Sequence, residues 1–170
     1  IDAFRGEGQI WDVVPGWGRG VRKQQEIEEA KRLLAEAGYP KGLDVEMLGG
    51  AWSNYAQQAE WAAGQLAKVG IRSKINLMES AVFQPRLAGG DYLFTAYSFG
   101  QTTGDPDESL GSYFITGGSR NWFSYSNSKV DELYLQQAQE QNPARRIQLA
   151  RQAEDLILRD MPLAPVPTYP

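Results

Sequence analysis

The sequence predicts an α/β fold in which helices pack on a sheet, and three observations support this prediction. Helix-type and strand-type patterns alternate through the first hundred residues, which is typical of helices layered on a sheet. Glycine follows each of the three helices expected there, at Gly38, Gly70 and Gly89-Gly90, where a helix commonly ends. Hydrophobic residues make up 42% of the 170 residues, which is enough for one buried core.

The first half of the chain is expected to alternate regularly. Apolar residues recur at helical spacing from Gln24 to Ala37, and Pro40 prevents that helix from continuing. Ser80 is expected to cap the third helix. The expected elements in chain order are a helix over 24–37, a strand over 43–47, a helix over 55–69, a strand over 71–77, a helix from Ser80 to Gly89-Gly90 and a strand over 92–98.

The second half of the chain is predicted to be mostly helical. Ser128 is the expected cap of a helix that runs through Gln139. Asn142 followed by Pro143 is typical of a helix start, and this helix is expected to reach Arg159. The prolines of residues 161–170 allow at most an edge strand, and residues 1–23 are expected to form an irregular lead-in segment.

Composition excludes several classes of function. Seventeen Lys and Arg against 21 Asp and Glu give a net charge of −4, which disfavours binding to nucleic acid or to an anionic membrane surface. The chain has no cysteine and no histidine, so thiol nucleophiles, disulfides, histidine bases and zinc held by these residues are excluded. The sequence has no apolar run long enough to cross a bilayer. A start at Ile1 without methionine or signal peptide indicates a fragment or a mature product.

The segment FGQTTGDPDESL, residues 99–110, has three interpretations. Asp105 or Asp107 caps the following helix, with Pro106 setting the turn. Alternatively, the two carboxylates form a D-x-D metal site, although no glycine-rich phosphate loop accompanies it. An acid/base pair requires carboxylates in different environments, which neighbours on one turn seldom have. A structural corner is the favoured interpretation.

Six stretches, in this order, resemble one protein family. Two of them are AKRLLAEAGYPKGLDVEM at 30–47 and QLAKVGIRSKINLME at 65–79. The others are Arg86-Leu87 to Asp91-Tyr92, GDPD at 104–107, Tyr125-Ser126-Asn127 to Val130-Asp131, and the helix from Pro143 that ends in Met161-Pro162. Together they resemble the family 5 extracytoplasmic solute-binding proteins of ABC importers, the dipeptide, oligopeptide and nickel type.

The resemblance implies a fold and a non-catalytic function. Residues 1–170 are expected to be a single C-terminal lobe of a type II periplasmic-binding-protein fold, a mixed sheet flanked by helices, with the other lobe outside this sequence. The protein is expected to capture a small polar solute, in the periplasm or anchored at the outer face of the cytoplasmic membrane, and to deliver it to ABC permease membrane subunits. Lobe closure would signal to the permease. The protein is expected to be a monomer without cofactor, metal or nucleic-acid partner.

The same resemblance places the segment between the third strand and the acidic corner at the solute cleft, with the candidate residues Phe99, Gln101, Thr102 and Thr103. Peptide binders of the family carry an aspartate at the position of Thr102, which holds the amino terminus of the ligand. A threonine supplies no charge, so a neutral solute such as a sugar is expected, unless Glu108 or an acid of the other lobe supplies it. Packing in the core is the other interpretation of Phe99.

Further candidates follow from the residues themselves. Trp52 and Tyr55 are expected at a second edge of the cleft, and Asn121 and Trp122 are candidates for contacts with a polar ligand. Arg145-Arg146 is expected to be a solvated helix face. A single lobe is expected to bind solute weakly by itself, because good pockets enclose about 70–90% of the ligand surface.

Two other functions remain open at this point. One is a metal-dependent enzyme that uses Asp105 and Asp107, or a hydrolase that uses carboxylates. The other is the ligand-binding lobe of a sensory receptor.

Overall fold

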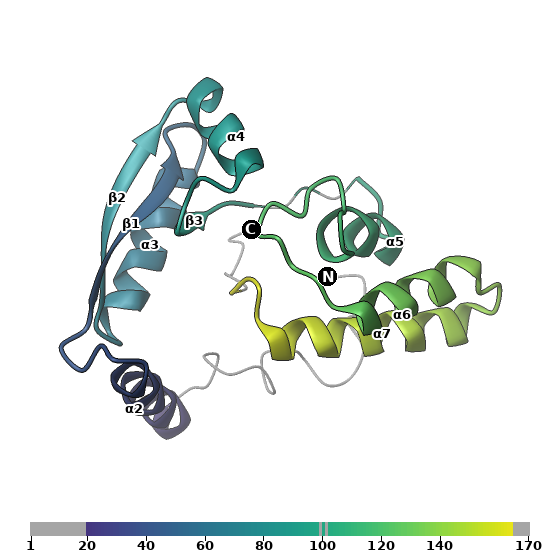
Figure 1. The fold of residues 1–170 in the computed structure, drawn as a ribbon, viewed down its shortest axis with the longest axis horizontal. Coiled ribbons are helices and arrows are strands. Elements are labelled where there is room, and N and C mark those ends of the chain that lie inside the picture. Colours follow the sequence, from purple (N-terminus) through teal and green to yellow (C-terminus); the bar gives the residue numbers. More distant parts are fainter. Residues whose placement is uncertain (1–19, 99, 101, 165–170) are drawn as a thin grey trace. The chain divides into compact units, whose positions relative to one another are not determined.

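The computed structural model describes residues 20–98, 100 and 102–164, and these fall into two compact units (Figure 1). Residues 20–98 form the sheet unit, and the described residues from 100 to 164 form the helical unit. Each unit is described by itself. The expected single lobe over 1–170 stays a prediction. The expected lead-in over 1–23 lies outside the described residues as far as residue 19, whereas residues 20–23 are helical.

The sheet unit alternates helices and strands as predicted. Its elements are α2 (Gly20–Glu36), β1 (Leu43–Gly50), α3 (Tyr55–Ala67), β2 (Ile71–Met78), α4 (Ser80–Gly89) and β3 (Phe94–Ala96). The three strands are parallel in the order β2-β1-β3. In this register Leu43 lies opposite Ile71, and Met47 lies between Ile75 and Phe94.

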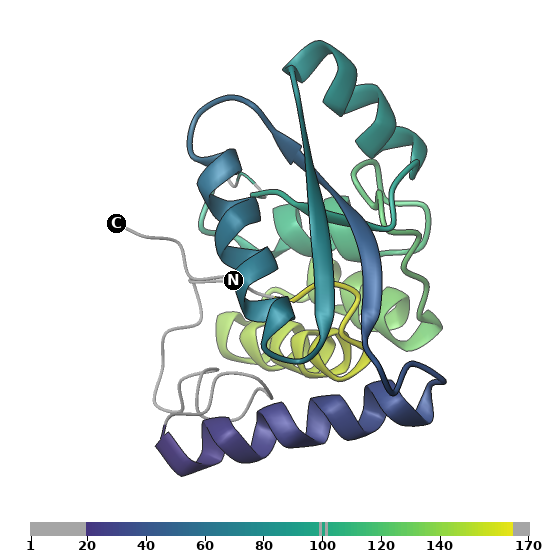
Figure 2. The ribbon, with the colours of Figure 1, turned by 90° about the vertical axis from the view of Figure 1, so that its left-hand side faces the viewer.

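The two faces of the sheet have different coverings. Side chains alternate between the faces along a strand. Met47 packs against Ala59 of α3, and α3 lies against the sheet in Figure 2. Met47, Ala59 and Ala96 form the buried cluster there. Glu46, the neighbour of Met47, points to the opposite face and lies 3.9 Å from Arg86 of α4.

Some boundaries in the sheet unit differ from the prediction. β3 comprises three residues instead of 92–98, because it pairs with β1 only over Met47–Gly49 and β1 ends at Gly50. The N-cap of α4 is Glu79, whose side chain makes no capping bond, and Ser80 is the first helical residue. Gly90, with a φ of 70°, ends α4 in the left-handed conformation that favours glycine.

The helical unit consists of short and long helices. Its elements are α5 (Pro106–Ser109), the π-helix η2 (Leu110–Phe114), α6 (Ser128–Gln139) and α7 (Pro143–Asp160). α6 and α7 lie side by side (Figure 1) and bury a shared apolar seam that includes Val130, Leu133 and Ala153.

The helix starts in this unit follow local signals. Asn142 caps α7 as predicted, because its side chain accepts hydrogen bonds from the backbone N–H groups of Ala144 and Arg145. The cap of α6 is Asn127 and not Ser128, because the amide oxygen of Asn127 accepts from the N–H of Lys129. Residues 161–164 form no strand, and the rest of the expected edge strand lies outside the described residues.

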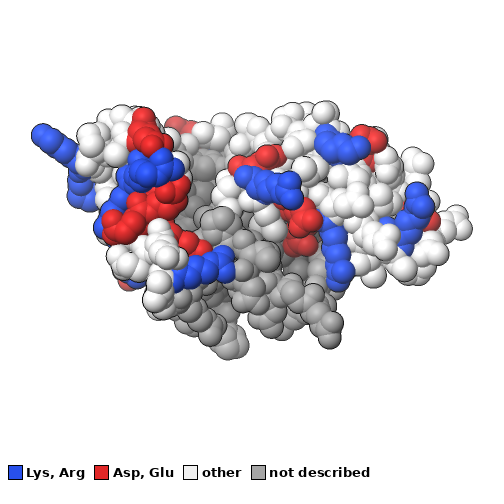
Figure 3. Space-filling view, turned by 90° about the horizontal axis from the view of Figure 1, so that it is seen from below, with Lys and Arg blue, Asp and Glu red and all other residues white. Residues whose placement is uncertain are grey.

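The surface carries mixed charges. Acidic and basic side chains are interspersed in the view of Figure 3. On α2 they pair at helical spacing, as in Lys31 with Glu28 and Arg32 with Glu29. Within the described parts of the chain, no helix combines the length and the apolar character needed to cross a membrane.

Candidate functional site

Four aromatic side chains gather in the sheet unit and are called the aromatic cluster: Trp52, Tyr55, Phe83 and Tyr97. The rings of Tyr55 and Tyr97 stack with a centroid distance of 5.2 Å and an interplanar angle of 12°. Trp52 meets Tyr55 and Phe83 edge-on, at 5.2 and 5.3 Å. Such offset and edge-to-face pairs are the favourable arrangements of aromatic rings.

The fold explains where the aromatic cluster lies. Trp52 follows the carboxyl end of β1, Tyr55 begins α3, and Tyr97 follows β3 directly. In the strand order β2-β1-β3, the chain leaves β1 toward β2 and returns on the other side of β1. This makes the gap between β1 and β3 a topological switch point, where open parallel sheets bind ligands at the carboxyl ends of the strands.

Polar groups accompany the aromatic cluster. The hydroxyl of Ser98 donates to the side-chain oxygen of Gln58 at 3.1 Å, and the amide of Gln84 donates to the hydroxyl of Tyr97 at 3.3 Å. Burial raises the pKa of Tyr55, and the neighbouring Tyr97 contributes to the increase. The phenol of Tyr55 is therefore neutral near pH 7 and can donate or accept hydrogen bonds.

The structure brings the predicted residues Trp52 and Tyr55 together. Tyr97 is not among the predicted site residues, because the strand expected over 92–98 includes it as one strand residue among several. Its position near the end of a β-prone segment is a signal that the sequence offers. Recognising that signal requires the strand order.

Thr102, Thr103 and Glu108, here called the Thr–Glu turn, form a second candidate site in the helical unit. The carboxylate of Glu108 accepts from the backbone N–H of Thr102 at 3.0 and 3.1 Å and from its hydroxyl at 2.7 Å. It also accepts from the N–H and the hydroxyl of Thr103 at 2.8 and 2.9 Å. The hydrogen bonds from Thr102 and then from Thr103 lower the pKa of Glu108 to about 2, so the carboxylate is ionised at neutral pH.

The acidic corner beside this turn consists of Asp105 and Asp107, and both carboxylates accept hydrogen bonds from other groups of the helical unit. Asp105 caps α5, as predicted, by accepting from the N–H of Asp107 at 2.9 Å. Its carboxylate also accepts two hydrogen bonds, of 2.6 and 2.7 Å, from the guanidinium of Arg146. Arg146, and then the N–H of Asp107, lower the pKa of Asp105.

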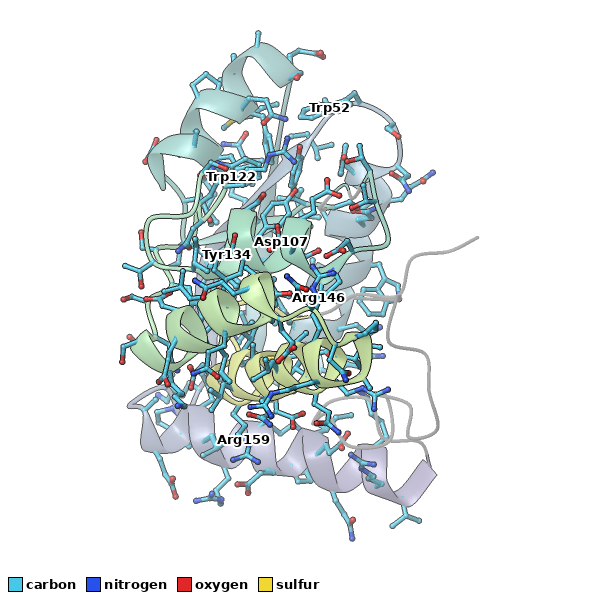
Figure 4. All side chains as sticks on the ribbon, turned by 90° about the vertical axis from the view of Figure 1, so that its right-hand side faces the viewer. Trp52, Asp107, Trp122, Tyr134, Arg146 and Arg159 are labelled. Carbon is cyan, nitrogen blue, oxygen red and sulfur yellow. The ribbon has the colours of Figure 1, made fainter. Side chains whose placement is uncertain are left out.

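A buried glutamine extends this corner to α6. Gln137, which has no exposed surface, accepts from Arg146 at 3.1 Å and donates to Asp107 at 2.9 Å. Burial, and then Asp107, raise the pKa of Tyr134 on the same helix. Figure 4 shows Asp107, Tyr134 and Arg146 close together.

The hydrogen bonds of Arg146 show that the prediction of a solvated Arg145-Arg146 face is wrong in part. They also concern the predicted alternative of a metal site at the D-x-D. Arg146 does not belong to a solvated helix face, because it turns inward to the capping carboxylate of α5. Its neighbour Arg145 is solvated as expected, with 72% of its side chain exposed. A metal at the D-x-D would have to displace Arg146 from Asp105. Among the described residues, no group of three or more acidic, His or Cys side chains is arranged to hold a metal ion.

The side chains of Asn121 and Trp122 contact other residues of the helical unit. The side-chain amide of Asn121 donates to the carbonyls of Ile115 and Tyr125 and accepts from the N–H of Tyr125. Trp122 meets Tyr113 edge-on at 6.2 Å. These contacts account for both side chains, so their role toward a ligand stays a prediction without geometric support. The candidates Phe99 and Gln101 lie outside the described residues.

An open hollow of about 420 Å³ lies elsewhere in the sheet unit, toward the amino-terminal ends of β1 and β2. Two of its charged side chains, Asp44 and Arg72, pair across the two strands at 2.7 Å. Because it lies away from the carboxyl ends of the strands, we assign it to the solvated face of the sheet.

Comparison with known proteins adds a family match. The family model described as "Bacterial extracellular solute-binding proteins, family 5 Middle" matches residues 5–121. The chain is 29% identical over 157 residues to the glutathione-binding protein GsiB of Escherichia coli K12, an alignment that covers 81% of the chain and 29% of GsiB. It is 28% identical over 146 residues to heme-binding protein A of Haemophilus influenzae, covering 82% of the chain and 27% of that protein.

A solved structure supports the same conclusion for the fold. HbpA2 from Haemophilus parasuis superimposes with a TM-score of 0.73 and 31% identity, over 79% of the chain and 28% of HbpA2. The architecture is therefore that of a periplasmic binding protein of type II fold. The chain spans less than a third of the length of each of these three proteins.

Proposed function

Because the chain belongs to family 5 of the bacterial extracellular solute-binding proteins, we propose that the protein containing it captures a small polar solute outside the cytoplasmic membrane. The solute would then pass to the membrane subunits of an ABC importer. The protein would act without catalysis, as a periplasmic monomer or one anchored at the outer face of the membrane.

The aromatic cluster at the β1–β3 switch point is the observation that carries this proposal. It places flat apolar rings next to hydroxyl and amide groups at the end of the sheet where such folds bind ligands. Apolar surface with a few placed polar groups is the usual composition of a small-molecule site. We propose that Trp52, Tyr55 and Tyr97 contact the solute.

Within the helical unit, and independently of the aromatic cluster, the Thr–Glu turn is proposed as a region that contacts a solute. Thr102 and Thr103 are exposed residues, and their hydroxyl groups donate to the carboxylate of Glu108. Phe99 and Gln101 precede the turn in the sequence and belong to the same proposal.

The relatives differ in what their names say they bind, glutathione in one case and heme in another. The family therefore accommodates chemically different solutes, and we propose a peptide, an oligosaccharide or a similar polar molecule for this protein. The metal-dependent enzyme is the weaker candidate, because Arg146 and the cap of α5 already engage the carboxylate of Asp105.

A thermal-shift screen of the full-length protein tests the proposal. The panel contains glutathione, heme, free-amino tripeptides, neutral oligosaccharides and nickel–histidine, and Mg²⁺ and Mn²⁺ test the enzyme alternative. We expect one class of solute to raise the melting temperature, and to raise it further at higher concentration, because binding to the folded state stabilises it. Tight binding of Mg²⁺ or Mn²⁺ that Asp105→Ala abolishes would instead favour the enzyme.

A further inference from the structure

The indole ring of Trp52 lies on the backbone of Gly50, the buried last residue of β1. A Cβ atom added to Gly50 would lie 2.7, 2.8 and 2.9 Å from Cζ3, Cη2 and Cε3 of the indole. Carbon atoms in contact lie about 3.5–4.0 Å apart. The ring therefore fills the space that a side chain at position 50 would need.

The same indole ring contacts two aromatic neighbours. It meets Tyr55 and Phe83 edge-on, at centroid distances of 5.2 and 5.3 Å. Phe83 has no exposed surface, and protein interiors are close-packed. An indole ring that is pushed away from Gly50 would therefore have to move toward solvent.

The backbone on both sides of Trp52 has a defined conformation. The N–H of Ala51 donates to the carbonyl of Met78 at 2.8 Å, which extends the pairing with β2 one residue beyond the end of β1. Ser53 has a φ of 54°, in the left-handed region that residues other than glycine seldom adopt. The backbone thus fixes where the side chain of Trp52 begins, and the space at Gly50 decides where its ring lies.

Gly50 is needed for the ring and not for the conformation of the chain. Its φ is not positive, so the backbone there is open to other residues. The preceding Gly49 differs in its surroundings, because the atoms nearest to a Cβ there belong to Leu77 at 2.9 Å and to Ala59 at 3.2 Å. A side chain at position 49 would disturb the core between the sheet and α3, whereas one at position 50 would displace Trp52.

We infer that Gly50 is a positioning residue of the solute site, because its missing side chain makes room for the indole ring of Trp52 and holds that ring beside Tyr55 at the β1–β3 switch point. The inference rests on the proposed function and deepens it. A side chain at position 50 weakens solute binding through Trp52, without any contact of its own with the solute.

Fluorine NMR of the full-length protein tests where the ring lies. The protein is labelled with fluorotryptophan, and the signal that disappears in Trp52→Phe belongs to Trp52. In Gly50→Ala we expect this signal to shift and to respond more strongly to exchange of H₂O for D₂O, which indicates exposure to solvent. Gly64→Ala is the control, because a Cβ there meets no atom within 4 Å, and it should leave the Trp52 signal unchanged.

A double-mutant cycle tests whether Gly50 acts through Trp52. Calorimetry uses the solute that the thermal screen selects from glutathione, heme, tripeptides, oligosaccharides and nickel–histidine. Gly50→Ala should weaken its binding by about tenfold, the size expected when an aromatic contact is lost. In a Trp52→Ala background the same substitution should change the affinity by less than about twofold, since no ring remains to be displaced. A merely structural role of Gly50 would persist in that background.

Melting temperatures complete the cycle and need no solute. The loss of stability in Gly50→Ala should disappear in the Trp52→Ala background, whereas that of Gly49→Ala should remain, because Gly49 faces Leu77 and Ala59. If Gly50→Ala does not fold, the inference requires that the double variant Gly50→Ala/Trp52→Ala does.

Three results would overturn the inference: an unmoved Trp52 signal in Gly50→Ala, equal effects of Gly50→Ala in both backgrounds, or unchanged affinity in Gly50→Ala although Trp52→Ala binds weakly. If Trp52→Ala itself binds the solute as the wild type does, the proposed solute site fails and the inference fails with it. Trp52→Ala therefore distinguishes a failure of the proposed function from a failure of the inference alone.

Discussion

The guanidinium of Arg146 on α7 donates two hydrogen bonds to the carboxylate of Asp105, the residue that caps α5, 41 positions earlier in the chain. The same guanidinium donates to Gln137 on α6, whose amide in turn reaches Asp107. One arginine thus connects three helices of the helical unit to the corner that follows the Thr–Glu turn. The planar fork of arginine suits this two-bond geometry, which lysine cannot reproduce.

Arg146→Ala is expected to lower the free energy of unfolding by about 2 kcal/mol, because it removes three hydrogen bonds and leaves the buried amide oxygen of Gln137 without this donor. The ion pair itself adds little, since 43% of the Asp105 side chain is exposed. Urea denaturation of the full-length protein measures the difference. Arg145→Ala is the control, and a change of no more than about 0.5 kcal/mol is expected because Arg145 is largely exposed. Equal effects of both variants would contradict the assigned role.

The Thr–Glu turn predicts a pH dependence. The pKa of Glu108 is about 2 in the folded state against its usual 4.5. A lowered pKa stabilises the folded state at pH values above 4.5, and this contribution disappears as the pH falls from 4.5 toward 2. The difference in melting temperature between wild type and Glu108→Gln should therefore narrow across this interval. Asp105 titrates in both proteins, so the difference isolates Glu108. A difference that stays constant down to pH 2 would show that Glu108 has no depressed pKa.

Local signals predicted most helices and strands, and they failed where distant residues meet. Gly38, Gly90 and Pro143 mark helix ends or starts because backbone conformation is decided within a few residues. The pairing of Arg146 with Asp105 has no such signal, since it depends on how α5 and α7 pack. From the sequence alone, a basic pair on a helix therefore predicts a solvated face.

The candidate site was predicted in part for the same reason. Trp52 and Tyr55 were identified because aromatic residues follow a glycine pair at the end of an expected strand. Their partners Phe83 and Tyr97 come from α4 and from the end of β3. Only the strand order β2-β1-β3 places these elements around one point, and periodicity along the chain contains no information on strand order.

Two glycines of the sheet unit predict opposite effects of the same substitution. Gly42 has a φ of 85°, and a Cβ there would collide with the carbonyl oxygen of Gly70, which accepts the hydrogen bond of Leu43 at 3.0 Å. Gly42→Ala should therefore destabilise the protein by about 2–4 kcal/mol.

Gly64 lies inside α3, and a Cβ there meets no atom within 4 Å. Gly64→Ala should stabilise by about 0.5–1 kcal/mol, because glycine is costly in a helix interior. Thermal and urea denaturation measure both, and a stable Gly42→Ala variant would refute the close approach.

The aromatic cluster predicts a loss of solute affinity that is separable from a loss of stability. Trp52→Ala in the full-length protein should weaken binding of the solute found in the thermal screen by at least about tenfold, which corresponds to about 1.4 kcal/mol. The reason is that a buried aromatic contact commonly contributes this much to a binding site. Tyr97→Ala should have a similar effect, because it removes the ring that stacks on Tyr55. Tyr39→Ala is the matched control: this tyrosine is 45% exposed and precedes β1, so it lies toward the other end of the strands. Isothermal titration calorimetry measures the affinities, and circular dichroism verifies that each variant is folded. If folded Trp52→Ala and Tyr97→Ala proteins bind the solute as tightly as Tyr39→Ala does, the switch point is not the solute site.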